Sequence, residues 1–287
     1  MSGAVAATTP DGSRLHLNHG PIDLIIEATG TTEVVAAAYD RAWVRFQPLL
    51  DELVEELPLL RRPFGDEHAA LRGTVALRMA AAVARFPDRF VTPMAAVAGA
   101  VADEIADAMW MGEDRGLRRC AVNDGGDIAV RLGAGETFVV GLVPLPDRPA
   151  LIGTATVLSE DPVRGIATSG RHGRSFSRGM ADAVTVLAAD AATADAAATL
   201  IANAVDLPGH PAIARTPARE LDPDTDLGDR LVTVEVGELT PQEIDDALAA
   251  GLAEADRMRA AEAIHAAVLC LGTLVLTVGP LRAAPVP

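Results

Sequence analysis

The densest group of chemistry-bearing residues in this 287-residue sequence lies in the segment 164–179. It holds four arginines and no carboxylate, in a chain whose formal net charge is −16. A guanidinium offers a planar fork of N–H donors that matches the oxygens of phosphate or carboxylate. The segment is therefore a candidate anion-binding loop, and the alternative is a solvated loop that pairs with the acidic surface. The candidate ligand-contacting residues are Thr168, Ser169, Gly170, Arg171, Arg174 and Arg178.

A second candidate is the run Asn-Asp-Gly-Gly-Asp at residues 123–127, between two expected strands. Two adjacent glycines let a ligand approach the backbone and leave N–H groups accessible. Asp-Gly is also the usual signal of a tight hairpin turn, and taken alone the run favours the turn. Asn123, Gly125 and Gly126 are retained as candidate contacts to a ligand.

The third candidate is the pair Asp195 and Thr199. A spacing of four residues on a helix places both side chains on one face. Carboxylate and hydroxyl oxygens are hard donors that suit Mg²⁺, which takes few protein ligands together with substrate phosphates. The alternative is that Asp195 is only an acid near the start of a helix, where the helix dipole favours negative charge.

Composition removes several classes of function. The chain contains no lysine, so all 24 basic residues are arginine, and a Schiff-base, pyridoxal-phosphate or phosphate-loop lysine is excluded. The excess of acids argues against general nucleic-acid binding, which needs a basic surface. Cys120 and Cys270 form no Cys-x-x-Cys pair, so we expect buried, inert thiols in a reducing cytoplasm.

The first half of the chain predicts elements that would position these residues. Residues 14–28 indicate two strands separated at Gly20-Pro21. A helix follows from Thr31 or Thr32, and Pro58 with Arg61-Arg62-Pro63 ends it. A second helix is expected over 67–84. Residues 94–109 predict an unusually small-residue helix, which invites close approach by another backbone or by a flat ligand.

The second half predicts a buried strand at 183–188 and a helix at 191–204 that Asp190 caps. Residues 207–227 indicate an irregular excursion. A capping box at Thr240–Glu243 predicts a long helix. The apolar stretch 263–278 is shorter than a membrane span, so we expect a buried helix that runs into a strand. No signal peptide is visible, and we expect a cytoplasmic protein without membrane contact.

Five short segments occur in the order found in the FAD:protein FMN transferases. The first keeps Gly99 and Asp103 in a small-residue helix, the second holds the Gly-Gly pair, and the third is Ala-Thr-Ser-Gly. The sequence thus resembles the ApbE-like superfamily and looks closest to its branch that carries a UPF label. The segments are 95–103, 123–128, 167–170, 183–186 and 195–199.

The resemblance implies a two-layer α+β fold of duplicated T-fold-like units, in which antiparallel sheets pack with helices. It implies a single domain over residues 1–280, built of two intertwined halves of about 1–115 and 116–280, followed by a tail at 281–287. A flavin-dinucleotide site would lie between the halves. By resemblance, Asp195, Thr199 and the carbonyl of Val97 would hold Mg²⁺, and the other candidates would contact FAD or a related phosphate-bearing ligand.

The sequence also departs from the transferase pattern. Ala98 stands where the transferases have lysine, and residues 171–180 replace their His-Ile-x-Asp-Pro-x-Thr-Gly loop. Two functions follow from the resemblance. One is an FAD-binding protein with flavin or nucleotidyl transfer, and the other is a non-catalytic ligand-binding or structural protein. Expected partners are a small phosphate-bearing ligand and no nucleic acid, and a homo-oligomer is left open.

Overall fold

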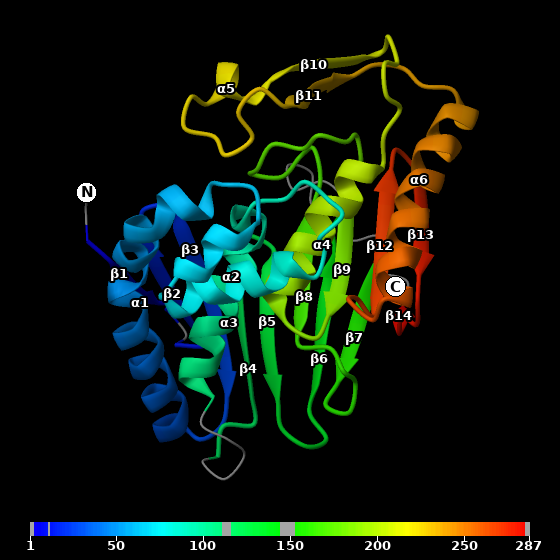
Figure 1. Ribbon diagram of the computed structural model, residues 1–287. Coiled ribbons are helices and arrows are strands. Elements are labelled where there is room, and N and C mark those ends of the chain that lie inside the picture. The colour runs from blue at the N-terminus through cyan, green and yellow to red at the C-terminus, as the bar shows by residue number, and fades with distance from the viewer. Residues whose placement is uncertain (1–2, 11, 111–115, 144–152, 285–287) are drawn as a thin grey trace.

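The computed structural model describes residues 3–10, 12–110, 116–143 and 153–284, and these residues fold around one large antiparallel sheet (Figure 1). In this described part of the chain, nine strands pair in the order β1-β2-β3-β4-β5-β8-β9-β12-β13. The strands are β1 Val5–Thr8, β2 Arg14–His19, β3 Ile22–Thr29, β4 Arg119–Asp124, β5 Asp127–Leu132, β8 Gly165–Ser169, β9 Ala183–Ala188, β12 Ala266–Leu271 and β13 Leu274–Val278.

Helices cover one face of this sheet, and Figure 1 shows them as a layer in front of the strands. They are α1 Thr32–Leu60, α2 Thr74–Ala84, α3 Val97–Met109, α4 Ala191–Ala204 and α6 Pro241–Ala260, with the 3₁₀ turns η1 Asp66–Ala70 and η2 Pro93–Ala96. Alternate strand residues such as Val184 and Val186 join the core beneath the helices. The predicted α+β class with antiparallel strands is confirmed.

The opposite face of the sheet is covered in part by a smaller sheet, with strands β6 Thr137–Leu142, β7 Gly153–Leu158 and β14 Ala283–Ala284. Val130 of β5 and Leu187 of β9 form a separate core cluster with Val157 of β7. Strand β14 pairs with β7, so the start of the expected tail at 281–287 belongs to a sheet. Residues 285–287 of that tail lie outside the described residues.

One sequence expectation in the helical layer needs correction. Helix α1 ends at Leu60 with Arg61 as its C-cap, within the expected run Pro58 to Pro63, because a proline near the last turn removes only one hydrogen bond and Leu60 is fully buried. The helix expected over 67–84 is divided into η1 and α2. In the described part of the chain, no helix combines the length and apolar composition that crossing a membrane requires.

The expected buried helix within 263–278 is wrong, because β12 and β13 form a hairpin there. Every residue of β12 is buried, since helices pack on one face and the smaller sheet on the other. A strand buried on both faces shows no alternation of polar and apolar residues, so its pattern does not differ from that of a buried helix. The excursion at 207–227 contains strand β10 Ile213–Pro217 and the short helix α5 Ala218–Leu221, and β10 pairs with β11 Leu231–Val236.

Two features of the fold position the candidate site. Gly125 and Gly126 have φ angles of 66° and 117°, and they make the tight turn between β4 and β5. The small-residue helix α3 approaches α4 so closely that a Cβ at Gly99 would lie 2.2 Å from the carbonyl oxygen of Ala191. The small residues of this helix allow close approach by another backbone or by a flat ligand. At Gly99 the structure shows the backbone of α4.

Candidate ligand-binding and cation site

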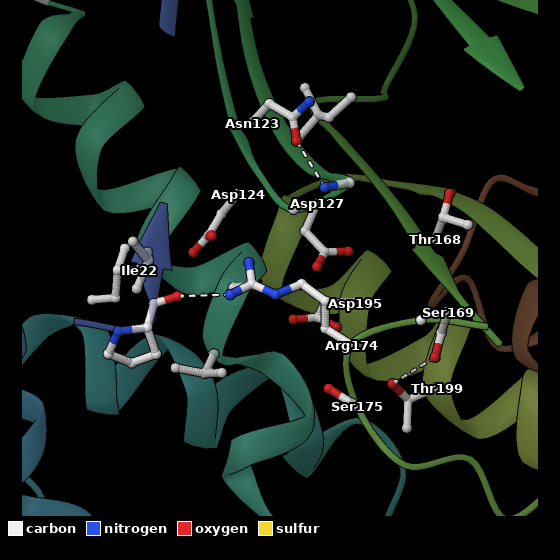
Figure 2. A pocket seen from close by; sticks show the side chains of 18 of the residues that line it. Ile22, Asn123, Asp124, Asp127, Thr168, Ser169, Arg174, Ser175, Asp195 and Thr199 are labelled. Atoms are coloured by element: carbon white, nitrogen blue, oxygen red, sulfur yellow. Dashed lines mark hydrogen bonds between the residues drawn. The ribbon is translucent and has the colours of Figure 1, made fainter. Parts of the chain in front are cut away.

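A cavity of about 890 Å³ opens between the helical layer and the ends of strands β4, β5, β8 and β9. One wall is apolar and comes largely from α1 and α3. The opposite wall carries hydroxyl, carboxylate and guanidinium groups, which Figure 2 shows at close range. The apolar wall includes Leu50, Leu53, Val54, Leu57, Met94 and Val101. Such a mixture suits a ligand with a flat apolar part and a charged part.

Most of the predicted site residues lie together in this cavity, although they come from four separate parts of the chain. The β4–β5 turn, the end of β8 with its following loop, and helices α3 and α4 all contribute. Those that line the cavity are Val97, Asn123, Gly125, Gly126, Thr168, Ser169, Gly170, Arg174, Asp195 and Thr199. Their contacts with a ligand remain predictions.

Asp195 and Thr199 lie one turn apart on α4, as their spacing predicts, and both point into the cavity (Figure 2). A carboxylate oxygen of Asp195 accepts a hydrogen bond of 3.1 Å from the backbone N–H of Gly99, at the start of α3. Burial raises the pKa of Asp195; the Gly99 N–H opposes this shift and the charge of Asp124 adds to it. Thr199 Oγ1 donates to Ser169 Oγ at 3.4 Å.

Asp127 follows the glycine turn and lines the same cavity. Its Oδ1 atom is buried without a hydrogen-bond partner among the described residues. Burial raises the pKa of Asp127, and the charges of Asp195 and Asp124 raise it further. A buried polar atom without a partner costs free energy, so its retention points to a partner that binds there.

Asp124 is buried at the end of β4, and burial raises its pKa to about 7. Asp124 and Asp127 belong to the run 123–127, but only Asn123, Gly125 and Gly126 of that run are predicted ligand contacts. Their positions on either side of the Gly-Gly pair could have indicated both acids as site residues. Their burial could not be predicted, because it depends on how β3, β4, β5 and β8 pair.

Arg174 reaches across the cavity from the loop after β8 (Figure 2). Its Nη2 donates to the carbonyl oxygen of Pro21 at 3.2 Å, and its Nη1 would lie 3.3 Å from a Cβ at Gly125. Within the described residues Arg174 makes no ion pair with a carboxylate within 4 Å. Its donors therefore remain available to an anionic ligand in the cavity.

Four predicted residues lie outside the lining of this cavity. Gly99 packs against Ala191, where only a residue without a Cβ fits. Asp103 accepts hydrogen bonds from the N–H groups at the start of α4. Arg171 pairs with Asp182 at 2.7 Å, and Arg178 lies near the ring of Phe90. The contacts of these four residues with a ligand stay predictions, and the structure shows the protein contacts that they make instead of lining the cavity.

The donor chemistry fits a hard cation. Asp195, Thr199 and Val97 all line the cavity, and Oδ1 of Asp127, which has no hydrogen-bond partner among the described residues, adds a further oxygen nearby. Among the described residues, no group of three or more His, Cys, Asp or Glu side chains could hold a metal ion. The predicted donor set consists of carboxylate, hydroxyl and carbonyl oxygens rather than of such a group.

The two cysteines are buried thiols, as predicted. Burial raises the pKa of Cys120 to about 12 and that of Cys270 to about 11, which keeps both in the unreactive thiol form at neutral pH.

Comparison with known proteins places the chain in a family. Residues 6–282 match the family described as AbpE bacteria, and the chain belongs to that family. The resemblance to the UPF-labelled branch of the ApbE-like superfamily is confirmed, because the sequence relatives are UPF0280 proteins of archaea.

Three of these relatives show the extent of the similarity. The Methanopyrus kandleri protein is 44% identical over 113 residues, which are 39% of this chain and 43% of that protein. The Methanothermobacter thermautotrophicus protein is 39% identical over 138 residues, 47% of this chain and 50% of the relative. The chain therefore spans about half the length of these two relatives. The Methanoregula boonei protein is 34% identical over 181 residues, 61% of this chain and 71% of the relative.

Two solved structures are also similar. The ApbE protein of Thermotoga maritima is 15% identical with a TM-score of 0.43, and the alignment covers 80% of this chain and 97% of that one. The apo form of the flavinyl transferase ApbE of Pseudomonas stutzeri is 14% identical with a TM-score of 0.44, covering 96% and 93%.

Proposed function

We propose that this protein binds FAD or a related phosphate-bearing ligand in the large cavity, together with Mg²⁺. The observation that carries the proposal is Oδ1 of Asp127, which is buried near Asp195 without a hydrogen-bond partner among the described residues. The same cavity holds the guanidinium of Arg174, which makes no ion pair with those residues. A cation with a bound phosphate would satisfy these carboxylates and the arginine at once.

The residues divide into three roles. Asp195, Thr199 and the carbonyl of Val97 hold Mg²⁺. Asp127 joins them, because the charge of Asp195 raises the pKa of Asp127 and the two carboxyl groups are therefore close enough to interact. Arg174 binds phosphate oxygens, and the apolar wall from α1 and α3 takes the flat ring system. When bound, Mg²⁺ neutralises phosphate charge and polarises the bond to be broken.

If the protein is an enzyme, the same geometry supports a transferase that moves a flavin or nucleotidyl group. The second candidate is a non-catalytic binding protein. It is favoured by His172, the histidine of the loop at 171–180, whose Nε2 lies 3.1 Å from Asp182 and which does not line the cavity. In this arrangement the loop offers the ligand an arginine but no histidine.

Thermal unfolding with FAD, FMN, ATP and pyrophosphate, each with and without Mg²⁺, tests ligand binding. A ligand at about 100 times its Kd stabilises the fold by about 2.7 kcal/mol. We expect a Mg²⁺-dependent shift with FAD that Asp195→Asn abolishes. Asp245→Asn on the solvent side of α6 is the matched control and keeps the shift. Equal FAD affinity in wild type and Asp195→Asn, with and without Mg²⁺, would contradict the metal role.

Chromatography of FAD incubated with the protein and Mg²⁺ separates the two candidate functions. Release of AMP that disappears in Asp195→Asn identifies an enzyme that cleaves the FAD pyrophosphate. It is a transferase if the FMN group is recovered bound to an added acceptor, and a hydrolase if it is recovered as free FMN. FAD recovered intact, despite Mg²⁺-dependent binding, identifies a binding protein.

A further inference from the structure

A second cavity, of about 520 Å³, lies apart from the first and shares no lining residue with it. Its walls come from the segment after α2, the loop before β9, the end of α4, and the β10–β11 hairpin. Four arginines and two carboxylates line it, in a protein whose acids outnumber its bases by 40 to 24 in total. The charged lining residues are Arg89, Arg178, Arg215, Arg230, Asp206 and Glu254.

Two of the four arginines are already neutralised. Arg89 donates to Glu254 at 2.6 Å, and Arg215 pairs with Asp206. The other two, Arg178 and Arg230, make no ion pair within 4 Å with any carboxylate in the described parts of the chain. The cavity therefore holds an excess of positive charge.

Arg178 and Arg230 gather around one aromatic ring. The guanidinium carbon of Arg230 lies 3.2 Å from the centre of the Phe90 ring, and that of Arg178 lies 5.9 Å from it. Burial lowers the pKa of Arg178, and repulsion by Arg230 lowers it further. The ring offsets part of this repulsion, since a cation over an aromatic face is attracted by its quadrupole.

The backbone around Arg178 is fixed by bonds to two other elements. Its N–H donates to Asn203 Oδ1 of α4 at 2.8 Å, and its carbonyl oxygen accepts from Arg215 Nη1 of β10 at 3.2 Å. The N–H of Thr233 donates to the carbonyl oxygen of Ser177 at 2.8 Å. The loop and the hairpin are thus joined at the cavity, which holds the two like charges together.

We propose that this second cavity is an anion site, in which Arg178 and Arg230 bind a phosphate group. A doubly charged phosphate presents several oxygens to two guanidinium forks, and it offsets the repulsion between the two arginines. The phosphate comes either as the free ion or as part of a nucleotide. The site does not depend on the function proposed for the large cavity.

Calorimetric titration with inorganic phosphate and with AMP, at constant ionic strength, tests the proposal. We expect wild type to bind phosphate. The double variant Arg178→Gln with Arg230→Gln should weaken this affinity at least about tenfold, because it removes two charge-assisted contacts of modest strength. Tighter binding of AMP than of phosphate assigns a nucleotide source, and equal binding assigns the free ion. Arg219→Gln, in the same hairpin region but paired with Asp229 on the surface, is the matched control and leaves the affinity unchanged.

Unchanged phosphate affinity in the double variant, or no phosphate binding by wild type, overturns the proposal. Arg178→Lys with Arg230→Lys retains both charges and reports on the fork geometry with little risk to folding, and we expect intermediate affinity. The Mg²⁺-dependent FAD shift serves as a separate readout. It stays in the double variant, so failure of this site and failure of the large cavity are distinguishable.

Discussion

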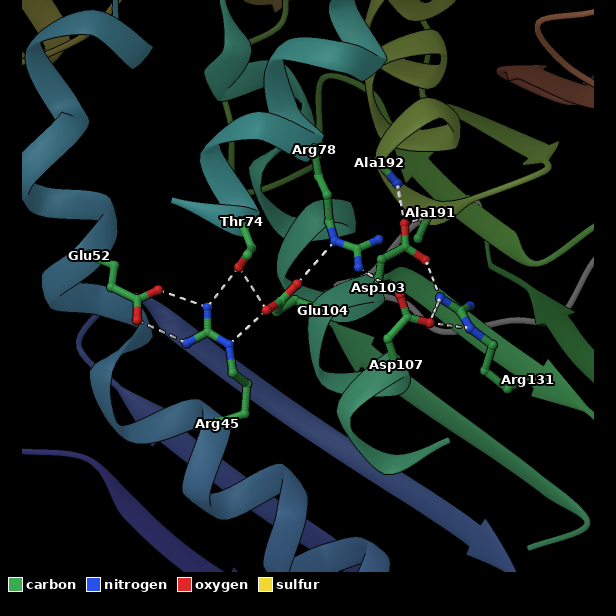
Figure 3. Close-up of polar contacts among 10 residues, drawn as sticks. All are labelled: Arg45, Glu52, Thr74, Arg78, Asp103, Glu104, Asp107, Arg131, Ala191 and Ala192. Atoms are coloured by element: carbon green, nitrogen blue, oxygen red, sulfur yellow. Dashed lines mark hydrogen bonds and ion pairs between the residues drawn. The ribbon is translucent and has the colours of Figure 1, made fainter. Parts of the chain in front are cut away.

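Buried carboxylates occupy two neighbouring regions of this protein under opposite conditions. In the network of Figure 3, Asp103 and Glu104 of α3 lie among arginines from α1, α2 and β5. In the large cavity, Asp124, Asp127 and Asp195 line a space that also contains Arg61 and Arg174, but none of the three acids makes an ion pair within 4 Å among the described residues. The first region holds the fold together, and the second is maintained at a cost to it.

The paired region is satisfied atom by atom. Glu104 accepts from Arg45 at 2.7 Å, from Thr74 at 2.7 Å and from Arg78 at 3.0 Å. Burial raises the pKa of Glu104, but the bonds from Arg45 and Thr74 outweigh this and leave it below its usual value. In the cavity, burial is not outweighed and the pKa of each acid is raised. Burial also raises the pKa of Asp103 in the paired region, to about 6, although Arg131 and two backbone N–H groups bind this carboxylate. The two regions therefore differ in the hydrogen-bond and ion-pair partners of their acids, and these partners decide whether a buried acid supports folding.

The largest expected effect is at Asp103. Asp103→Ala leaves Arg131 without this partner in the interior and removes the acceptor of the Ala191 and Ala192 N–H groups. Breaking such a buried arrangement costs about 3–5 kcal/mol. Urea unfolding measures the loss. A loss of unfolding free energy below about 1 kcal/mol would mean that the paired acids do not stabilise the fold more than the cavity acids do.

The second prediction concerns Asp124, whose replacement should stabilise the ligand-free protein. Its pKa is raised from 3.8 to about 7, so the unfolded state loses its proton first and stability falls as the pH rises from about 4 to 7. Asp124→Asn is therefore neutral near pH 4 and stabilising by up to about 4 kcal/mol above pH 7. Urea unfolding at both pH values, in the presence of EDTA, checks the sign. Destabilisation above pH 7 would show that Asp124 has a partner there.

A smaller effect is expected where the network reaches the surface. Glu52 accepts from Arg45 at 2.7 Å, but its side chain is 40% exposed. Glu52→Gln should cost about 0.5–1 kcal/mol, because water replaces part of the interaction. Urea unfolding measures this loss of stability. A cost equal to that of Asp103→Ala would mean that the contribution of an ion pair in this network does not depend on its burial.

The smallest effect provides the baseline. Arg14 and Glu27 pair at 2.6 Å with side chains 53% and 44% exposed. Arg14→Gln should change stability by no more than about 0.5 kcal/mol, and less at high salt. Thermal unfolding at two salt concentrations tests this, with the salt-insensitive Asp103→Ala as the comparison.

Local signals in the sequence predicted much of the helical layer. Asp190 caps α4 through a 2.7 Å bond from the N–H of Thr193, and the Thr240–Glu243 capping box starts α6. These features depend on residues within one turn of each other. The hairpin at β12 and β13 could not be predicted in this way, because its pattern depends on what covers each face of the sheet.

In the candidate site too, features that depend on local spacing could be predicted, and features that depend on distant contacts could not. The shared face of Asp195 and Thr199 follows from a spacing of four residues, and the structure shows it. The exclusion of Arg178 from the large cavity does not follow from spacing, because four residues separate it from Arg174 in a loop without regular geometry. Its position depends on Phe90, Asn203 and the β10–β11 hairpin, which are distant in sequence.

The contacts between α3 and α4 are reciprocal. Asp103 of α3 accepts the first N–H groups of α4, while Asp195 of α4 accepts the N–H of Gly99 at the start of α3. Neither helix can fray at its N-terminus without exposing a carboxylate or an amide of the other. The amide protons of Gly99, Ala191 and Ala192 should therefore exchange with solvent deuterium in one cooperative opening, with a common rate that reports the integrity of the whole helical layer.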